Sequence, residues 1–256
     1  EREVRHLPSL KLLLEMHKAD KSYPEAIQVA DRILAQEPTN IDVTKDKAII
    51  LDAMGMNQEA MRTFRQALSW GTRNIKQANE VLAAMLSSGR YEGSLSLADA
   101  VLERQDHDSM YWRLRGNALY ALERFEDSVN CYSKGLEINP DDAWLWYSKG
   151  MSLESLSHFR EAVDCYDRAI VRDLENVDFW MSKASCLEML HVKGEALKCY
   201  DQVLRVKAGH LHALLRKGLI LAEMERFDEA LFFFAKANEM TRNSPKITAR
   251  PSDSSA

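Results

Sequence analysis

The sequence predicts an all-α protein built from stacked helix pairs, and three recurring columns of residues lead to that prediction. A small residue recurs at intervals of 34, at Gly116, Gly150, Ala184 and Gly218. Twelve positions after Gly116 stands a second small residue, Ser128, and four further on an aromatic one, Tyr132, and both recur with the same period. Self-similarity at a fixed period of this length is typical of solenoids, in which each repeat buries its apolar face only against its neighbours.

The columns keep one register over residues 7–244, which gives seven repeats of 34 residues without an insertion or deletion. The expected repeats are 7–40, 41–74, 75–108, 109–142, 143–176, 177–210 and 211–244. Residues 1–6 would form an N-terminal extension. Residues 245–256 are polar and carry two prolines, so they are expected to form a flexible polar tail. The sequence is expected to be either a segment of a longer chain or a chain that has been shortened at both ends.

The repeat at 109–142 shows how each helix arises. Apolar residues between Tyr111 and Leu122 recur at three- and four-residue spacing, as one buried helical face does. Residues 123–125 interrupt that spacing, and a second apolar run follows from Val129 to Ile138. Each repeat is therefore predicted to be two antiparallel helices joined by a three-residue turn, which amounts to fourteen helices and no strand.

The ends of the repeats carry helix stop and start signals. Pro140 ends the second helix of its repeat, because proline cannot continue a helix interior. Asp142 follows, and its carboxylate can accept hydrogen bonds from the free N–H groups of the next helix. Pro38 and Asn40 mark the end of the first repeat in the same way.

The small columns have a packing explanation. Helix axes approach to about 8–10 Å only where the residues at the crossing permit it. Gly116 and Ser128 would lie where the two helices of one repeat cross, with Tyr132 filling the space beside them. A glycine inside a helix costs roughly 1 kcal/mol relative to alanine, so a recurring one implies a gain in packing.

These columns resemble the signature of the tetratricopeptide repeat. The residues that carry the resemblance best are Trp146, Gly150, Leu153, Phe159, Ala162, Tyr166 and Ala169. The resemblance implies a right-handed superhelical solenoid of antiparallel helix pairs that acts as a protein–protein interaction scaffold. Some repeats depart from the signature: Asn57 and Lys193 replace the aromatic of the turn, and Thr72 and Asp106 are among the replacements of the closing proline.

Composition excludes several classes of function. The net charge of −5, with both signs interspersed, argues against nucleic-acid binding, which needs a basic footprint. No apolar stretch approaches the length of a membrane span, and no signal peptide is recognisable, so a cytoplasmic location is expected. The sequence contains no GxSxG, no Gly-rich phosphate loop and no HExxH motif, so we expect no enzyme activity and no cofactor.

Cysteine and histidine spacings raise the question of disulfides and metals. Cys131, Cys165 and Cys199 are 34 residues apart, so they occupy one place in three successive repeats, roughly a helix diameter of 10 Å from each other. A disulfide needs Cα atoms closer than about 7 Å, so these cysteines are predicted to be buried and reduced. His210 and His212 lack the carboxylate or cysteine cluster that would complete a metal site.

The predicted binding site is the face of the first helix of each repeat, which should line a concave groove. The residues on its central part are Met110, Arg113, Asn117, Tyr120, Trp144, Tyr147, Met151, Met181 and Ser185. Aromatic residues, methionine and arginine are enriched at binding hot spots, so a partner peptide is expected here. For Trp144 and Tyr147 two interpretations stay open, contact with a ligand or packing between repeats.

The first three repeats carry a mixed charge on the same face, with Lys18, Lys45, Asp46 and Glu80 among its members. Such a mixture is predicted to be a solvated face rather than a second recognition surface.

The last helix carries four apolar residues in succession, from Leu231 to Phe234. A helix distributes four consecutive residues around its whole circumference, so one buried face cannot hide them all. An exposed apolar patch of Phe232 or Phe233 with Leu231 is therefore expected to form an end interface. This leaves two alternatives to peptide binding: a homo-oligomer assembled through the C-terminal end, or a regulatory arm of a larger enzyme or signalling protein.

Overall fold

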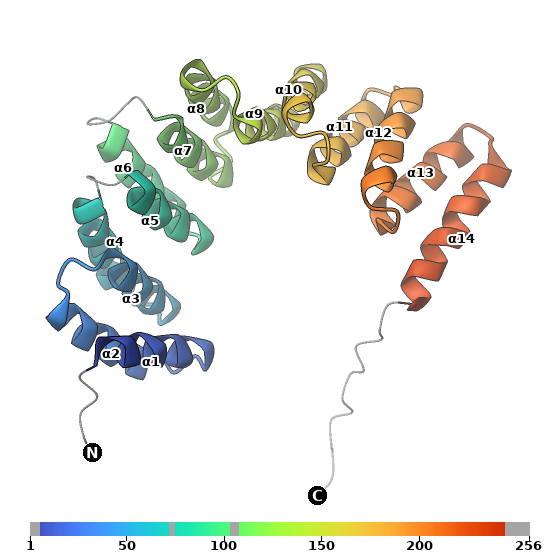
Figure 1. Ribbon diagram of the computed structural model, residues 1–256. Helices are drawn as coiled ribbons and strands as arrows, with labels where there is room; N and C mark the ends of the chain where they lie inside the picture. The colour runs from blue at the N-terminus through green and yellow to red at the C-terminus, as the bar shows by residue number, and fades with distance from the viewer. Residues whose placement is uncertain (1–5, 72–74, 103–107, 244–256) are drawn as a thin grey trace, which may run out of the picture. The chain divides into compact units, whose positions relative to one another are not determined.

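The computed structural model describes residues 6–71, 75–102 and 108–243. These residues form fourteen α-helices and no strand, so the predicted all-α fold is confirmed (Figure 1). The chain divides into two compact units, residues 1–141 and residues 142–256. Within each unit, every first helix packs along the second helix of the same repeat and is followed by the next pair.

The first unit contains four helix pairs. Their bounds are α1 (Leu7–Ala19), α2 (Tyr23–Gln36), α3 (Ile41–Ala53), α4 (Asn57–Gly71), α5 (Ile75–Ser87), α6 (Tyr91–Leu102), α7 (Ser109–Ala121) and α8 (Phe125–Ile138). Its core passes from repeat to repeat, because Phe64, Leu82 and Tyr111 come from three successive repeats and share one buried cluster. This continuity is what a solenoid needs, since one helix pair alone leaves its apolar face uncovered.

The second unit contains three helix pairs. They are α9 (Ala143–Ser155), α10 (Phe159–Arg172), α11 (Val177–Met189), α12 (Lys193–Val206), α13 (Leu211–Glu223) and α14 (Phe227–Asn243). Its main buried cluster again joins successive repeats, with Leu187 and Tyr200 from one pair and Ile220 from the next. The first helices begin at Ala143, Val177 and Leu211, at intervals that equal the repeat period in the sequence.

Every turn inside a helix pair contains one residue in the left-handed conformation. These residues are Lys21, Gly55, Gly89, Glu123, Ser157, His191 and Glu225, with φ between 56° and 76°. The residue after each one donates its N–H to a carbonyl in the last turn of the first helix, as Arg124 does to Leu119 at 2.9 Å. This is the Schellman arrangement, which satisfies the orphan carbonyls of a helix end and fixes the entry into the second helix.

Side chains cap the first helices of most repeats. The carboxylate of Asp142 accepts hydrogen bonds from the N–H groups of Trp144 and Leu145, at 2.9 and 3.1 Å. Asn40 and Asn176 cap α3 and α11 in the same manner, and the ring of His210 caps α13. The predicted role of Asp and Asn after each second helix is therefore confirmed, and each such cap typically contributes about 1 kcal/mol.

The crossing of the two helices in each pair is built from a small residue and a ring. A Cβ atom added to Gly150 would lie 2.6 Å from Cε1 of Tyr166, and one added to Gly116 would lie 2.4 Å from the same atom of Tyr132. Ala184 stands at this place in the sixth repeat, where it and Tyr200 are both buried. The predicted small-residue column is therefore confirmed, and its neighbour at the crossing is the aromatic column.

Substitutions of glycine by valine in the second unit test this packing. Gly150→Val should lower the free energy of unfolding by roughly 1–3 kcal/mol, because extra methyl groups would enter a filled space against Tyr166. Gly194→Val is the matched control, since a Cβ there meets nothing within 4 Å. Urea denaturation of both variants measures the difference. Equal losses would contradict the packing explanation, and Gly150→Ala should fall between wild type and Gly150→Val.

Candidate functional site

The first helices of the first unit form one hollow, which we call the α5–α7 hollow. It has a volume of about 540 Å³ and is lined by Glu80, Ala83, Leu86, Met110, Arg113, Leu114 and Asn117. Three of the predicted groove residues, Met110, Arg113 and Asn117, therefore lie together here. The fourth on this helix, Tyr120, does not line the hollow, because its ring packs edge-on against Phe125 with centroids 5.4 Å apart.

Polar groups in the α5–α7 hollow are oriented by their neighbours. The hydroxyl of Tyr132 donates to Oδ1 of Asn117 at 2.8 Å, which fixes the amide group that lines the hollow. The guanidinium of Arg113 lies 2.8 Å from the sulfur of Met110, and its Nε is buried without a hydrogen-bond partner. This hollow thus offers donors beside a polarisable apolar surface.

The second unit has its own hollow on the first helices, the α9–α13 hollow. It has a volume of about 360 Å³ and is lined by Glu154, Met181, Ser182, Ser185, Tyr200, His212 and Arg216. Two predicted groove residues, Met181 and Ser185, belong to it. Met151 is half-buried on α9 and does not line it.

An aromatic cluster lies next to the α9–α13 hollow. Trp144 is 46% exposed, and its ring meets Phe179 and Tyr147 edge-on with centroids 5.2 and 5.7 Å apart. The Tyr147 ring lies 4.9 Å from that of Phe179, and its hydroxyl accepts a hydrogen bond from Ser182 at 3.4 Å. Tyr147 thus packs between repeats, whereas Trp144 packs on one edge and presents the rest of its ring. Contact of Trp144 with a ligand stays a prediction.

Two carboxylates that the predicted site omitted, those of Glu154 and Glu188, accept hydrogen bonds from tyrosines of the second helices. The hydroxyl of Tyr166 donates to Glu154 at 2.7 Å, and Tyr200 donates to Glu188. Burial, reinforced by these carboxylates, raises the pKa of both tyrosines above the ordinary value. Arg216 of the next repeat also binds Glu188, with Nε 3.2 Å from Oε1. A signal existed in the sequence, because Glu188 and Arg216 are 28 residues apart and so face each other across adjacent repeats.

The charged face of the first three repeats was predicted to be solvated, and the structure corrects this in part: Glu15 and Asp42 are exposed, but other charges pair across helices. Lys18 binds Asp46 at 2.9 Å, and their side chains are only 30% and 19% exposed. Lys45 binds Glu80 at 3.3 Å. Partial burial lowers the pKa of Lys18, but hydrogen bonds to Glu15 and Asp46 outweigh it, and the net pKa is raised. These pairs join neighbouring first helices and occupy the charges that a ligand would otherwise meet.

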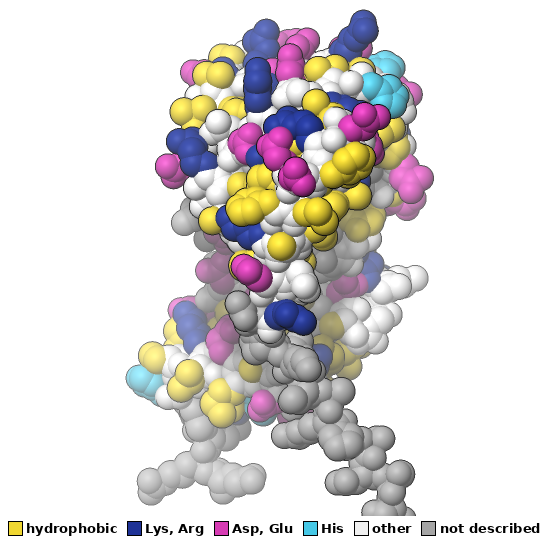
Figure 2. All heavy atoms as spheres, turned by 90° about the vertical axis from the view of Figure 1, so that its right-hand side faces the viewer, with side chains coloured by type: hydrophobic (Ala, Val, Ile, Leu, Met, Phe, Trp, Pro, Cys, Tyr) yellow, Lys and Arg dark blue, Asp and Glu magenta, His cyan; other side chains and the backbone are white. Residues whose placement is uncertain are grey.

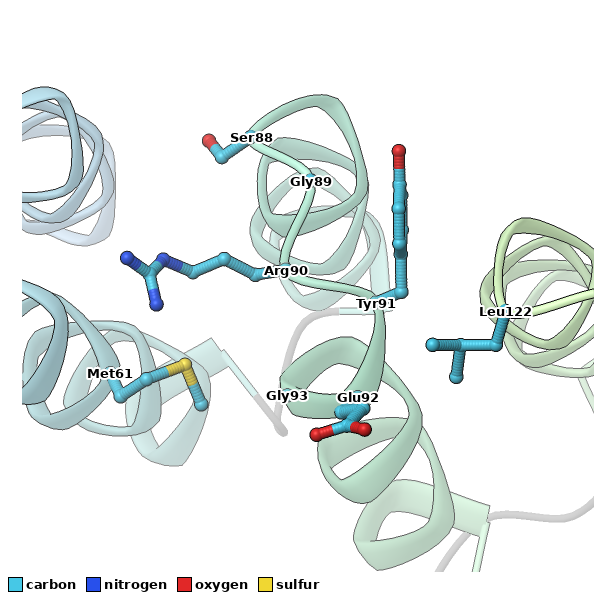
Figure 3. Close-up of a pocket in the computed structure, with 8 residues that line it drawn as sticks. All are labelled: Met61, Ser88, Gly89, Arg90, Tyr91, Glu92, Gly93 and Leu122. Carbon is cyan, nitrogen blue, oxygen red and sulfur yellow. The ribbon is translucent and has the colours of Figure 1, made fainter.

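A third hollow lies at the turn between α5 and α6, with a volume of about 520 Å³ (Figure 3). Figure 3 shows that the side chain of Arg90 points away from Tyr91. The guanidinium contacts the carboxylate of Asp52 and donates to Asn57 at 2.6 Å. Its charge is therefore engaged inside the first unit, and no predicted site residue lines this hollow.

The exposed surface of the N-terminal half of α14 carries the predicted apolar residues in part. Leu231 is 65% exposed, Phe232 62% and Phe227 61%. Figure 2, which faces the side where α14 lies, shows hydrophobic side chains gathered among charged ones. Phe233 is different: it is half-buried against the core, and the ammonium of Lys217 lies 4.2 Å from the centre of its ring. We therefore define the α14 patch as Leu231, Phe232 and Phe227.

The cysteines and histidines of the described part of the chain were the candidates for disulfides and metal binding. All four cysteines are buried and unpaired, as predicted for the three at the repeat spacing. Groups of three or more His, Cys, Asp or Glu side chains that could hold a metal ion do not occur among the described residues. His210 instead caps α13, with Nδ1 3.2 Å from the N–H of Ala213. Among the described helices, none has the length and apolar character needed to cross a membrane.

Comparison with protein-family profiles identifies the repeats. Profiles described as tetratricopeptide repeat match residues 18–85, 147–190 and 194–245, and one described as TPR repeat matches residues 116–157. The chain belongs to the tetratricopeptide repeat family. The resemblance seen in the glycine and aromatic columns is thus confirmed.

Curated relatives of this TPR chain match only in part. The ER membrane protein complex subunit 2-A of Xenopus laevis is 26% identical over 96 residues, which are 38% of this chain and 32% of that protein. The uncharacterized protein y4yS of Sinorhizobium fredii is 32% identical over 74 residues, which are 29% of this chain and 41% of that protein. The matched stretches therefore span 32% and 41% of the lengths of these relatives.

Solved structures share the TPR fold at low sequence identity. A crystal structure of MamA superposes with a TM-score of 0.62 at 18% identity, covering 70% of this chain and 96% of that one. YrrB, described as a TPR protein with an unusual peptide-binding site, gives a TM-score of 0.59 at 20% identity, covering 71% and 93%. At such identities the likeness establishes the fold alone.

The buried cysteines give a direct chemical prediction. Burial raises the pKa of Cys165 and of Cys199 to about 11, so their reactive thiolates are scarce at mildly alkaline pH. In the native protein all four thiols should react with a disulfide reagent far more slowly than in the urea-unfolded chain. Fast reaction of any of them in the folded state would contradict the burial described above.

Proposed function

We propose that this chain is a protein–protein interaction scaffold that holds a peptide segment of a partner protein on the face of its first helices. The observation that carries the proposal is the position of the two hollows, because each lies on the first-helix face of its own unit and together they contain five of the nine predicted groove residues. Ligand sites are concave and mainly apolar, with a few placed polar groups. The α5–α7 hollow has this character, whereas the lining of the α9–α13 hollow is mostly polar, with Met181 as its apolar member.

The aromatic residues beside the α9–α13 hollow supply the expected anchor. Trp144 is held by Phe179 and Tyr147, so its exposed part is pre-organised and a ligand need not order it on binding. A rigid exposed tryptophan beside a hollow that contains Met181 combines two residue types that favour binding hot spots. The description of YrrB as a peptide-binding TPR protein supports the same role for a related fold.

The proposed role is not catalytic and uses no cofactor, metal or nucleic acid. Four cysteines that are buried and free of disulfides suit a reducing compartment, so we place the protein in the cytoplasm as part of this proposal. The acidic net charge of −5 suits a protein or peptide partner better than a polyanion.

A pair of tryptophan substitutions tests the scaffold proposal. Peptides selected from a random library on the immobilised full chain serve as the probe. Trp144→Ala should weaken their binding by about 2 kcal/mol if the ring is a hot spot, and should cost roughly 0.5–1.5 kcal/mol of stability through the lost ring contacts. Isothermal titration and urea unfolding give the two values.

Trp146→Ala is the matched control, because Trp146 is part of the same helix but packs against the buried Ala169 and Ile170 under the guanidinium of Arg168. This variant should lose about 3 kcal/mol or more of stability while binding peptide normally at low temperature. Equal losses of affinity in both variants would remove Trp144 from the binding surface.

Self-association through the C-terminal end is a second candidate function, favoured by the α14 patch. Phe227, Leu231 and Phe232 are each more than 60% exposed, and contiguous apolar surface of this kind commonly marks an interface. A second copy related by a two-fold axis would cover both patches at once, because such an interface pairs identical surfaces.

Sedimentation velocity of the full chain tests self-association. Phe232→Glu should shift any dimer to monomer, because a charge placed at the centre of an apolar contact is desolvated without a partner. Val171→Glu is the control, since Val171 is 75% exposed on α10 away from the patch. A wild-type protein that stays monomeric at high concentration, or two variants with equal effects, would refute this candidate.

A further inference from the structure

Glu154, on the first-helix face of the second unit, differs from the charged residues at the same position of other repeats. Four repeats place a charged residue at the same position near the end of the first helix: Lys18, Asp52, Glu154 and Glu188. Three of them bind an opposite charge, since Lys18 binds Asp46, Asp52 contacts Arg90 and Glu188 contacts Arg216. Among the residues that the structure describes, no Lys, Arg or His forms an ion pair with Glu154. This residue is therefore the exception within its column.

Comparison of two successive repeats shows which cation is absent beside Glu154. Arg216 reaches Glu188 from the next first helix, 28 residues further along the chain. The residue at the same separation from Glu154 is Ser182, whose hydroxyl donates to Tyr147. A guanidinium is thus replaced by a short neutral side chain, and the space that the cation would fill belongs to the α9–α13 hollow.

The rest of the environment prepares Glu154 to receive a cation. Tyr166 donates to Oε2 at 2.7 Å, and Ser185 donates weakly to Oε1 at 3.5 Å, so the carboxylate is fixed in position. Cys186 lies close enough that its thiol pKa is raised, first by burial and then by the charge of Glu154. A half-buried carboxylate with unused acceptor capacity interacts more strongly with an added cation than a fully hydrated one does, because less water screens the pair.

We propose that Glu154 is the specificity residue of the α9–α13 hollow and receives a lysine or arginine side chain of the bound peptide. The ligand cation occupies the place that Arg216 takes at Glu188, with the hydroxyls of Ser182 and Ser185 as further acceptors beside it. Met181 supports the aliphatic stem of the same side chain. This inference rests on the proposed peptide-binding function and adds the chemistry that the partner must carry.

A double-mutant cycle on the full chain tests the pairing. Peptides are selected from a random library on the wild-type protein, and those whose binding is lost in Trp144→Ala are kept. We expect them to be enriched in one basic position. Replacing that residue by norleucine, or replacing Glu154→Gln, should each weaken binding about tenfold, and both together no more than either alone. Glutamine keeps an acceptor for Tyr166, so the fold is expected to survive.

Two further variants sharpen the test. Ser182→Arg supplies the cation from within the chain, so it should suppress binding of basic peptides about as strongly as Glu154→Gln while the unfolding temperature is not lowered. Glu175→Gln removes an exposed carboxylate in the turn before α11 and should leave binding unchanged.

The outcomes separate the two proposals. Peptides that depend on Trp144 but show no basic position, or additive losses in the cycle, would overturn the role of Glu154 and leave the scaffold function standing. Unchanged binding of basic peptides by Ser182→Arg would overturn it as well. Failure to select any peptide that depends on Trp144 would overturn both.

Discussion

The contact between a small residue of one helix and an aromatic ring of the next is the constraint on which the rest of this structure depends. At Gly150 the ring of Tyr166 comes so close that even a methyl group would have to displace it. Because the ring fills the crossing, the two helices of the repeat can approach and share one core. The same ring also crosses the helix layer, and its hydroxyl ends at Glu154 on the first-helix face. Core packing and the chemistry of the candidate site are therefore joined in one side chain.

This double use recurs and varies between repeats. Tyr132 donates to Asn117 in the fourth repeat, and Tyr200 donates to Glu188 in the sixth. The seventh repeat has Phe234 in this column, which fills the crossing beside Gly218 without a hydroxyl to offer. Packing at the crossing thus needs only an aromatic ring, whereas a tyrosine hydroxyl also orients a polar group on the exposed face. Replacing tyrosine by phenylalanine therefore changes that face and leaves the packing intact.

The repeat columns predicted most of the fold, because every repeat must solve the same packing problem with residues of the same size. They did not predict the left-handed turn residue, since five of its seven instances are not glycine: Lys21, Glu123, Ser157, His191 and Glu225. A non-glycine residue in that conformation costs roughly 1 kcal/mol and leaves no mark in composition. The left-handed residue is held by the hydrogen bond from the N–H of the residue after it to a carbonyl of the first helix. That bond depends on where the helix ends and only weakly on which residue adopts the left-handed conformation.

The candidate site was predictable to the extent that it depends on one helix. The spacing of Met110, Arg113 and Asn117 places them on one face, and the structure brings them to one hollow. Spacing along one helix could not predict the contacts between neighbouring helices. Phe233 was expected in the end patch, but Lys217 from α13 lies over its ring. The mixed charges of the first repeats were expected in solvent, but Lys18 and Asp46 meet across two first helices. Such pairs become visible only when the repeats are aligned at the spacing that stacking imposes.

That alignment also shows what the proposed binding role would cost this scaffold in stability. An ion pair such as that of Glu188 with Arg216 satisfies both charges inside the chain, and a ligand would have to break it to use either one. The repeat before it keeps the carboxylate and its tyrosine support but carries Ser182 in place of the arginine. The chain thereby forgoes a stabilising pair at one position and keeps a fixed, half-buried carboxylate, which is the charge that we propose a partner meets. Stability given up locally at a binding surface is a recurring cost of function. In a solenoid that cost stays small, because the flanking repeats and their interfaces hold the fold independently of this one pair.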